Sequence, residues 1–168
     1  LIQSLRFRLN EKESLSKKIF IPLAIHNCDR FINEFRKLLI NSPTNNFPRF
    51  DVKNHPVILN SKKHLDLKSK LEKIMEIYKD RFSDTSPNNN TSIFFGVTAA
   101  ILEALEKGVN VIHFCSDPVF ESYSEKIWPN LKVQQSNKYV FRYNLTLSGK
   151  LINFDNNKTL KQILKTIF

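Results

Sequence analysis

The stretch TSIFFGVTAAILEALEKGVNVIHF, residues 91–114, decides the fold. It begins and ends with short apolar runs, residues 91–95 and 109–114, which predict strands, and the near-continuous apolar character of residues 109–114 is typical of a strand buried on both faces. The Ala- and Leu-rich residues 98–107 between these runs favour a helix. The stretch therefore predicts a strand, a crossover helix and a second strand.

The sequence before this unit continues the same alternation. Residues 19–25 and 49–53 predict short strands, and apolar residues at helical spacing predict helices after Asn27 and over residues 65–78. Parallel strands need long crossover connections of this kind. The chain therefore predicts an α/β fold, as a Rossmann-like three-layer domain with a mainly parallel sheet and helices on both faces.

The end of the chain carries weaker patterns. Residues 131–135 predict a fifth strand, and residues 139–147 fit either a strand or a helix. Two further segments fit helices, residues 121–128 and 158–168.

A chain of 168 residues is the length of one domain. We expect one domain over residues 1–168, with a lead-in segment 1–17, a core 18–135 and a C-terminal extension with a closing helix over 136–168. Because the first residue is not Met, we expect the chain to be a piece of a longer protein.

The glycines exclude two classes of nucleotide site. The chain has only three, Gly96, Gly108 and Gly149. Dinucleotide fingerprints and P-loops need two or three glycines within a few residues, so both are disfavoured. Gly96 instead fits the turn before the helix of residues 98–107, and Gly108 fits the left-handed position commonly found after a helix.

The net charge and the two cysteines limit the kinds of binding partner and cellular compartment that we expect. The formal net charge of +10 fits a phosphate-bearing ligand, an anionic membrane surface or an ordinary solvated surface. The basic residues are mostly lysines on helical faces, so we expect no nucleic-acid partner. Two distant cysteines predict neither a metal site nor a disulfide framework, which favours a reducing cytoplasm. No apolar stretch approaches 18 residues, the length that spans a membrane.

Open parallel sheets bind ligands outside the carboxyl ends of their strands. This rule selects residues 95–98, where Thr98 follows the Gly96 turn. Thr98 is placed to cap the helix or to donate its hydroxyl to a phosphate, and Glu103 to accept hydrogen bonds from a ribose diol. The alternative interpretation is an ordinary N-cap and a solvated helix residue.

The same rule selects residues 53–56, Lys-Asn-His-Pro. Because Pro56 ends the strand, we expect His55 to project from the carboxyl edge, where it can donate to a phosphate or act as a general acid. A turn histidine is the alternative. His26 and Arg30 flank the first loop, residues 25–29, and Arg30 fits either a diphosphate clamp or a surface arginine. We interpret the fourth loop, residues 115–118, as a turn. His113 lies inside an apolar strand, so we interpret it as a structural histidine.

Two of these segments resemble a known family. Residues 53–56 resemble the K-x-H-P strand end of bacterial surface-polysaccharide transferases, and residues 94–112 resemble the turn and E-A-x-x-x-G-x-P-V-I segment of the same enzymes. Both fit the C-terminal, donor-binding half of a GT-B glycosyltransferase. The resemblance covers residues 18–135 and depends mainly on residues 53–56 and 92–114. Asn110 departs from it, since the family commonly has Pro there.

The resemblance implies a transferase that uses a nucleotide-activated sugar in capsule or lipopolysaccharide-type synthesis, with no cofactor and no metal. In it His55 and Thr98 would contact the donor phosphate and Glu103 the ribose, with Lys53, Pro56 and Gly96 completing the two motifs. His26 and Arg30 are secondary candidates. The glycan acceptor and the catalytic base would belong to a missing N-terminal domain, so this chain is not expected to complete a transfer.

The cysteines favour a cytoplasmic protein, and the basic N-terminal half is compatible with a peripheral contact at the anionic inner face of the membrane or with an ordinary solvated surface. Two alternatives share the expected fold: a stand-alone, non-catalytic Rossmann-like module, and half of a sugar-nucleotide epimerase.

Overall fold

The structure is a computed structural model that describes residues 15–24, 28–55, 58, 61–96, 98, 100–116 and 130–146. Nine helices and strands, together with a short 3-10 turn at Lys79–Arg81, make up the fold of these residues. They are β1 (Lys18–Phe20), α2 (Cys28–Ile40), β2 (Asp51–Lys53), α3 (Lys62–Ile77), β3 (Thr91–Phe95), α4 (Ala100–Glu106), β4 (Asn110–Phe114), β5 (Leu131–Asn137) and β6 (Val140–Leu145).

The six strands form one sheet in the order β2-β1-β3-β4-β6-β5. The first four strands pair in parallel, and β6 pairs antiparallel with both β4 and β5. The α/β class and the mainly parallel sheet are confirmed. The segment that fitted either a strand or a helix forms β6, so the sheet continues beyond residue 135.

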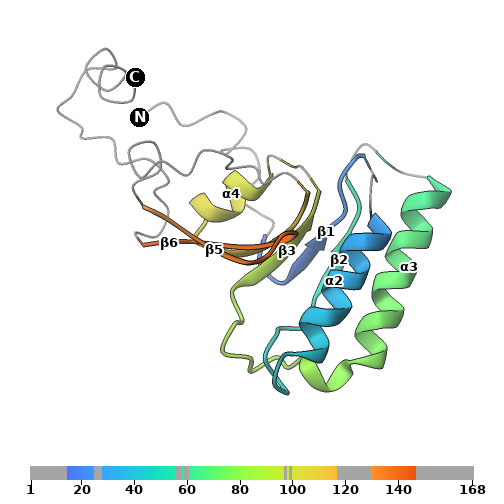
Figure 1. The fold of residues 1–168 in the computed structure, drawn as a ribbon, viewed down its shortest axis with the longest axis horizontal. Coiled ribbons are helices and arrows are strands. Elements are labelled where there is room, and N and C mark those ends of the chain that lie inside the picture. The colour runs from blue at the N-terminus through green and yellow to red at the C-terminus, as the bar shows by residue number, and fades with distance from the viewer. Residues whose placement is uncertain are drawn as a thin grey trace, which may run out of the picture.

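Helices cover the two faces of the sheet unequally (Figure 1). Side chains of a strand alternate between faces. Along β3, Ile93 and Phe95 belong to one hydrophobic cluster together with residues of α2 and α3. The intervening Phe94 belongs to a second cluster that contains residues of α4. The longer helices α2 and α3 therefore share one face, and the short α4 packs against the other.

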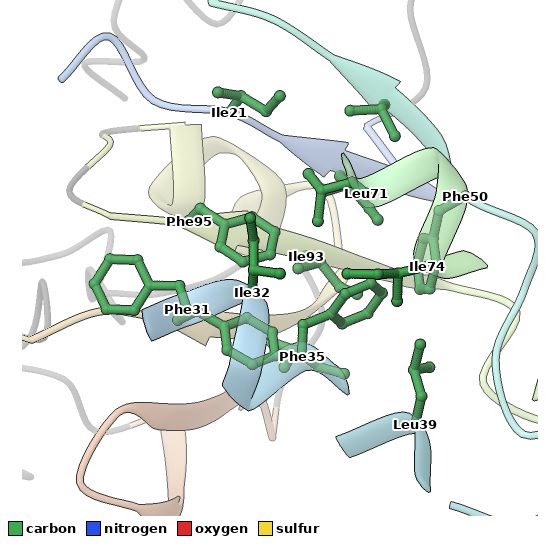
Figure 2. Close-up of a cluster of buried hydrophobic side chains, with 14 of the residues drawn as sticks. Ile21, Phe31, Ile32, Phe35, Leu39, Phe50, Leu71, Ile74, Ile93 and Phe95 are labelled. Atoms are coloured by element: carbon green, nitrogen blue, oxygen red, sulfur yellow. The ribbon is translucent and has the colours of Figure 1, made fainter. Parts of the chain in front are cut away.

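The spacing of the aromatic residues in α2 explains how that helix packs. Phe31, Phe35 and Leu39 recur every fourth residue and are almost fully buried. Phe35 meets Phe95 and Phe114 edge-on, with ring centroids 6.2 and 6.0 Å apart. Figure 2 shows this cluster between α2, α3 and the sheet.

The first strand is shorter than the predicted residues 19–25, because it ends at Phe20. The Ile21 N–H still donates to the Lys53 carbonyl at 2.9 Å, but Pro22 has no N–H to continue the ladder. Helix α3 begins three residues before the predicted Leu65, and α4 is shorter than predicted. The cap expected at Asn27 and the helices expected over 121–128 and 158–168 lie outside the described residues.

Candidate functional site

The strand order identifies a topological switch point between β1 and β3. After β1 the chain crosses to β2 on one side, and after β2 it returns to β3 on the other side of β1. Ligands in open α/β sheets bind at such a point, outside the carboxyl ends of the strands. The described residues that follow these two ends are Ile21–Ala24 after β1 and Gly96 after β3.

Gly96 makes the turn at the end of β3 and is held from three directions. Its φ is +65°, in the left-handed region that favours glycine. Its N–H donates to the Phe114 carbonyl at 2.8 Å, and its own carbonyl accepts from His113 Nε2 at 2.6 Å. A Cβ at this position would lie 3.1 Å from Pro22 Cγ. The two turns at the switch point therefore touch each other.

Thr98 acts as the cap that one of the two interpretations predicted. Its Oγ1 accepts from the Ala100 N–H at 3.3 Å. A hydroxyl that accepts can still donate its hydrogen to another group, so the cap does not prevent contact with an anion. Helix α4 has only seven residues, Ala100–Glu106, against the ten expected, which weakens the argument from its dipole.

Glu103 lies in the first turn of α4 and pairs with a lysine just after the end of that helix. Its Oε1 is 2.9 Å from Lys107 Nζ, and its side chain is 15% exposed. A ribose diol at this position would have to share the carboxylate with the Lys107 ammonium.

The Lys-Asn-His-Pro segment leaves β2, which is separated from β3 by one strand. Neighbouring strands are about 4.8 Å apart, so the ends of β2 and β3 are separated by about 10 Å. His55 is half-buried, and its carbonyl accepts from the Ile58 N–H at 2.9 Å. Lys53 Nζ pairs with Asp51 Oδ2 at 2.9 Å, on the outer strand of the sheet. Pro56 lies outside the described residues, as does His26.

Arg30 is engaged with the β5–β6 hairpin. Its Nη1 donates to the Tyr139 hydroxyl at 3.0 Å, and its guanidinium lies 5.0 Å from the centre of the Tyr139 ring. The next turn of α2 adds Glu34, whose Oε2 accepts from Asn137 Nδ2 at 2.8 Å. Arg30 is thus an exposed arginine whose contacts join α2 to the hairpin, a partner that neither interpretation from the sequence named.

Two buried histidines contribute to the site in a way the sequence did not reveal. His113 is fully buried in β4, and its Nδ1 lies 3.3 Å from the Tyr143 hydroxyl. Burial lowers the pKa of His113 from 6.5 to about 4, although the bond to Gly96 acts in the opposite direction. His64 of α3 is 6% exposed, and its Nε2 lies 3.1 Å from the Pro22 carbonyl. The partners are 17 and 42 residues away in the sequence, so no local pattern indicates them.

A hollow of about 510 Å³, open to solvent, lies between the first turns of α2 and α3. Its lining has three basic residues, Arg30, Lys63 and Lys70, and two acidic residues, Asp29 and Asp66, and Lys70 pairs with Asp29, so charges of both signs lie side by side there. The Cys28 thiol also lines it. Burial, together with the charge of Asp29, raises the pKa of Cys28 to about 11, which suppresses the reactive thiolate.

Within the described residues, no three His, Cys, Asp or Glu side chains gather as a metal site. In the same part of the chain, no helix combines the length and apolar character needed to cross a membrane. No protein-family model, curated protein or solved structure matches the chain.

Proposed function

We propose that this chain is the donor-binding part of a GT-B glycosyltransferase that builds a bacterial surface polysaccharide. In this proposal the domain is Rossmann-like with three layers, and it binds a nucleotide-activated sugar at the carboxyl edge of the sheet. The observation that carries the proposal is the switch point between β1 and β3, because it is the position where open α/β sheets bind nucleotides.

The phosphates are proposed to lie between the ends of β2 and β3. The strand spacing puts these ends about 10 Å apart, a gap that a nucleotide with its phosphates can bridge. His55 approaches from the β2 side, and the Thr98 hydroxyl approaches from the β3 side. Strand β1, which lies between β2 and β3, ends at Phe20.

The ribose is proposed to lie over α4, against Glu103. The Glu103 side chain is largely buried and negatively charged, and its partner Lys107 follows one turn later. Ribose hydroxyls donate well to a carboxylate, and the nearby ammonium compensates the charge when the diol binds. In this arrangement the protein is cytoplasmic, with a peripheral contact at the inner membrane face, and the glycan acceptor binds a separate N-terminal domain.

The test is calorimetry of the chain against CMP, CDP, UDP and GDP. We expect one base to bind, and we expect His55→Ala and Glu103→Ala each to weaken that binding by about tenfold. Glu76→Ala is the control, because Glu76 also pairs with a lysine three residues later, Lys79 in the 3-10 turn, but lies at the far end of α3. The absence of binding at about 1 mM for all four nucleotides would remove the proposal.

A second experiment separates the transferase from the two alternatives. The intact protein is incubated with the nucleotide sugar whose base binds, with and without a glycan acceptor. Release of nucleotide that depends on the acceptor supports the transferase. Interconversion of the sugar without an acceptor identifies an epimerase, and binding with no turnover under either condition identifies a non-catalytic module.

A further inference from the structure

The two turns that flank the switch point share an unusual feature. Each turn has a backbone carbonyl bonded to a buried histidine: Pro22 to His64 from α3, and Gly96 to His113 from β4. The two histidines come from different elements, and both are more than nine-tenths buried. The turns also touch each other, through Gly96 and Pro22 Cγ.

The chemistry of these contacts sets the tautomer of both rings. A carbonyl oxygen can only accept, so each Nε2 must carry the hydrogen of its contact. For His113 the Tyr143 hydroxyl lies at Nδ1 and can donate to it, which favours that tautomer further. Tyr143 is 1% exposed and is anchored in β6, so the arrangement couples the Gly96 turn to the antiparallel part of the sheet.

We infer that His113 and His64 are positioning residues of the switch-point site, which hold the exits of β3 and β1 through their Nε2–H groups so that the ligand meets a preformed edge. The inference depends on the proposed function only for the identity of the ligand. The positive φ of Gly96 takes its carbonyl out of the hydrogen-bond ladder of the sheet. A buried N–H donor can hold that carbonyl in place and leave the solvent-facing side of the turn open to a ligand.

The experiment compares leucine and glutamine at each histidine. Leucine removes the donor, whereas the glutamine amide can reach the position of Nε2 and donate to the same carbonyl. We expect His113→Leu and His64→Leu to weaken nucleotide binding by about tenfold at a temperature where circular dichroism shows them folded. We expect His113→Gln and His64→Gln to bind within about threefold of wild type. Folded leucine variants with wild-type affinity would overturn the inference.

Two readouts do not require a bound nucleotide. In the wild-type protein, both rings should show a slowly exchanging Nε2–H signal in ¹⁵N-resolved NMR spectra. The backbone amide of Gly96 should exchange with solvent about tenfold faster in His113→Leu, while the amide of Leu71 in α3 is unchanged. Tyr143→Phe, which removes only the hydroxyl, replaces His113→Leu if that variant does not fold, and it should also accelerate exchange at Gly96.

These readouts separate the inference from the proposed function. If no nucleotide binds the wild type but the Gly96 amide responds as expected, the proposed function fails and the positioning role stands. If nucleotides bind but neither affinity nor Gly96 exchange responds to the histidine variants, the positioning role fails and the proposed function stands.

Discussion

Gly96→Ala tests the geometry of the switch point most directly. An alanine at φ +65° carries the strain of the left-handed region, about 1–2 kcal/mol, of which about 0.4–1 kcal/mol is offset by the stiffer unfolded chain. The added methyl group would lie 3.1 Å from Pro22 Cγ, and overpacking of this kind costs at least about 1 kcal/mol more. We therefore expect a loss of about 2–3 kcal/mol in the free energy of unfolding.

Gly108→Ala is the matched control. Gly108 also has a positive φ, +74°, and the contact with Pro22 belongs to Gly96. Gly108→Ala should therefore show the backbone strain without the Pro22 contact, a loss of about 1 kcal/mol. Urea unfolding followed by circular dichroism measures both losses.

The contact with Pro22 can be isolated by a double-mutant cycle. In a Pro22→Ala background Cγ is absent, so Gly96→Ala should cost no more than Gly108→Ala costs in the wild type. The reasoning is refuted if Gly96→Ala and Gly108→Ala cost the same in the wild-type background, or if Pro22→Ala leaves the extra cost of Gly96→Ala unchanged.

Four further predictions follow from the burial and the contacts of single residues. The pKa of Cys28 is raised to about 11, so the folded protein holds about a hundredfold less thiolate at this position than an ordinary cysteine would. At pH 8, iodoacetamide should therefore modify Cys28 about a hundredfold more slowly in the folded protein than in the protein unfolded by urea. Equal rates in the two states would contradict this. His113 binds a proton at about pH 6.5 when unfolded but only near pH 4 when folded, so stability should fall as pH drops through that window by up to about 3 kcal/mol. His113→Gln should lose this component in urea titrations from pH 7 to pH 4.5, and an identical pH profile would count against the assignment. Phe35→Ala should cost about 3–5 kcal/mol in urea, whereas Ile40→Ala, at a half-exposed position on the same helix, should cost less than about 1; similar losses would contradict the packing. Glu34→Ala should lower the free energy of unfolding by about 1–2 kcal/mol, because it leaves Asn137 Nδ2 and Lys37 without this carboxylate. Glu72→Ala is the control, since Glu72 belongs to a loose, exposed ion pair. If Glu34→Ala does not change the stability, the bonds to the hairpin contribute nothing.

The elements of the parallel half could be predicted because their signals are local. The apolar run of β3 was predicted with its observed bounds, Thr91–Phe95, and the helix after it was predicted between Gly96 and Gly108. The β6 segment fits either a strand or a helix by sequence alone, although its alternation of apolar and polar side chains favours a half-buried strand. Its place between β4 and β5 depends on hydrogen bonds to both of those strands.

The candidate site also has features that the sequence predicted and features that it did not. The sequence identified the loops after β2 and β3, because Pro and Gly mark the ends of strands whatever the rest of the fold does. It could not show that Arg30 is engaged with Tyr139, or that Glu103 shares its carboxylate with Lys107. A side chain's partner depends on which elements pack together, and for Arg30 and Tyr139 the partners are 109 residues apart.

The amino-acid sequence by itself determined the α/β class, the alternation of strands and helices, and the glycine at the turn after β3, because periodicity and turn chemistry are properties of a few neighbouring residues. Tertiary structure decided the strand order, and with it the switch point between β1 and β3. It also decided that two histidines of no apparent importance in the sequence hold the carbonyls at that point. These features arise from burial and hydrogen bonding between segments that meet only when the sheet has formed.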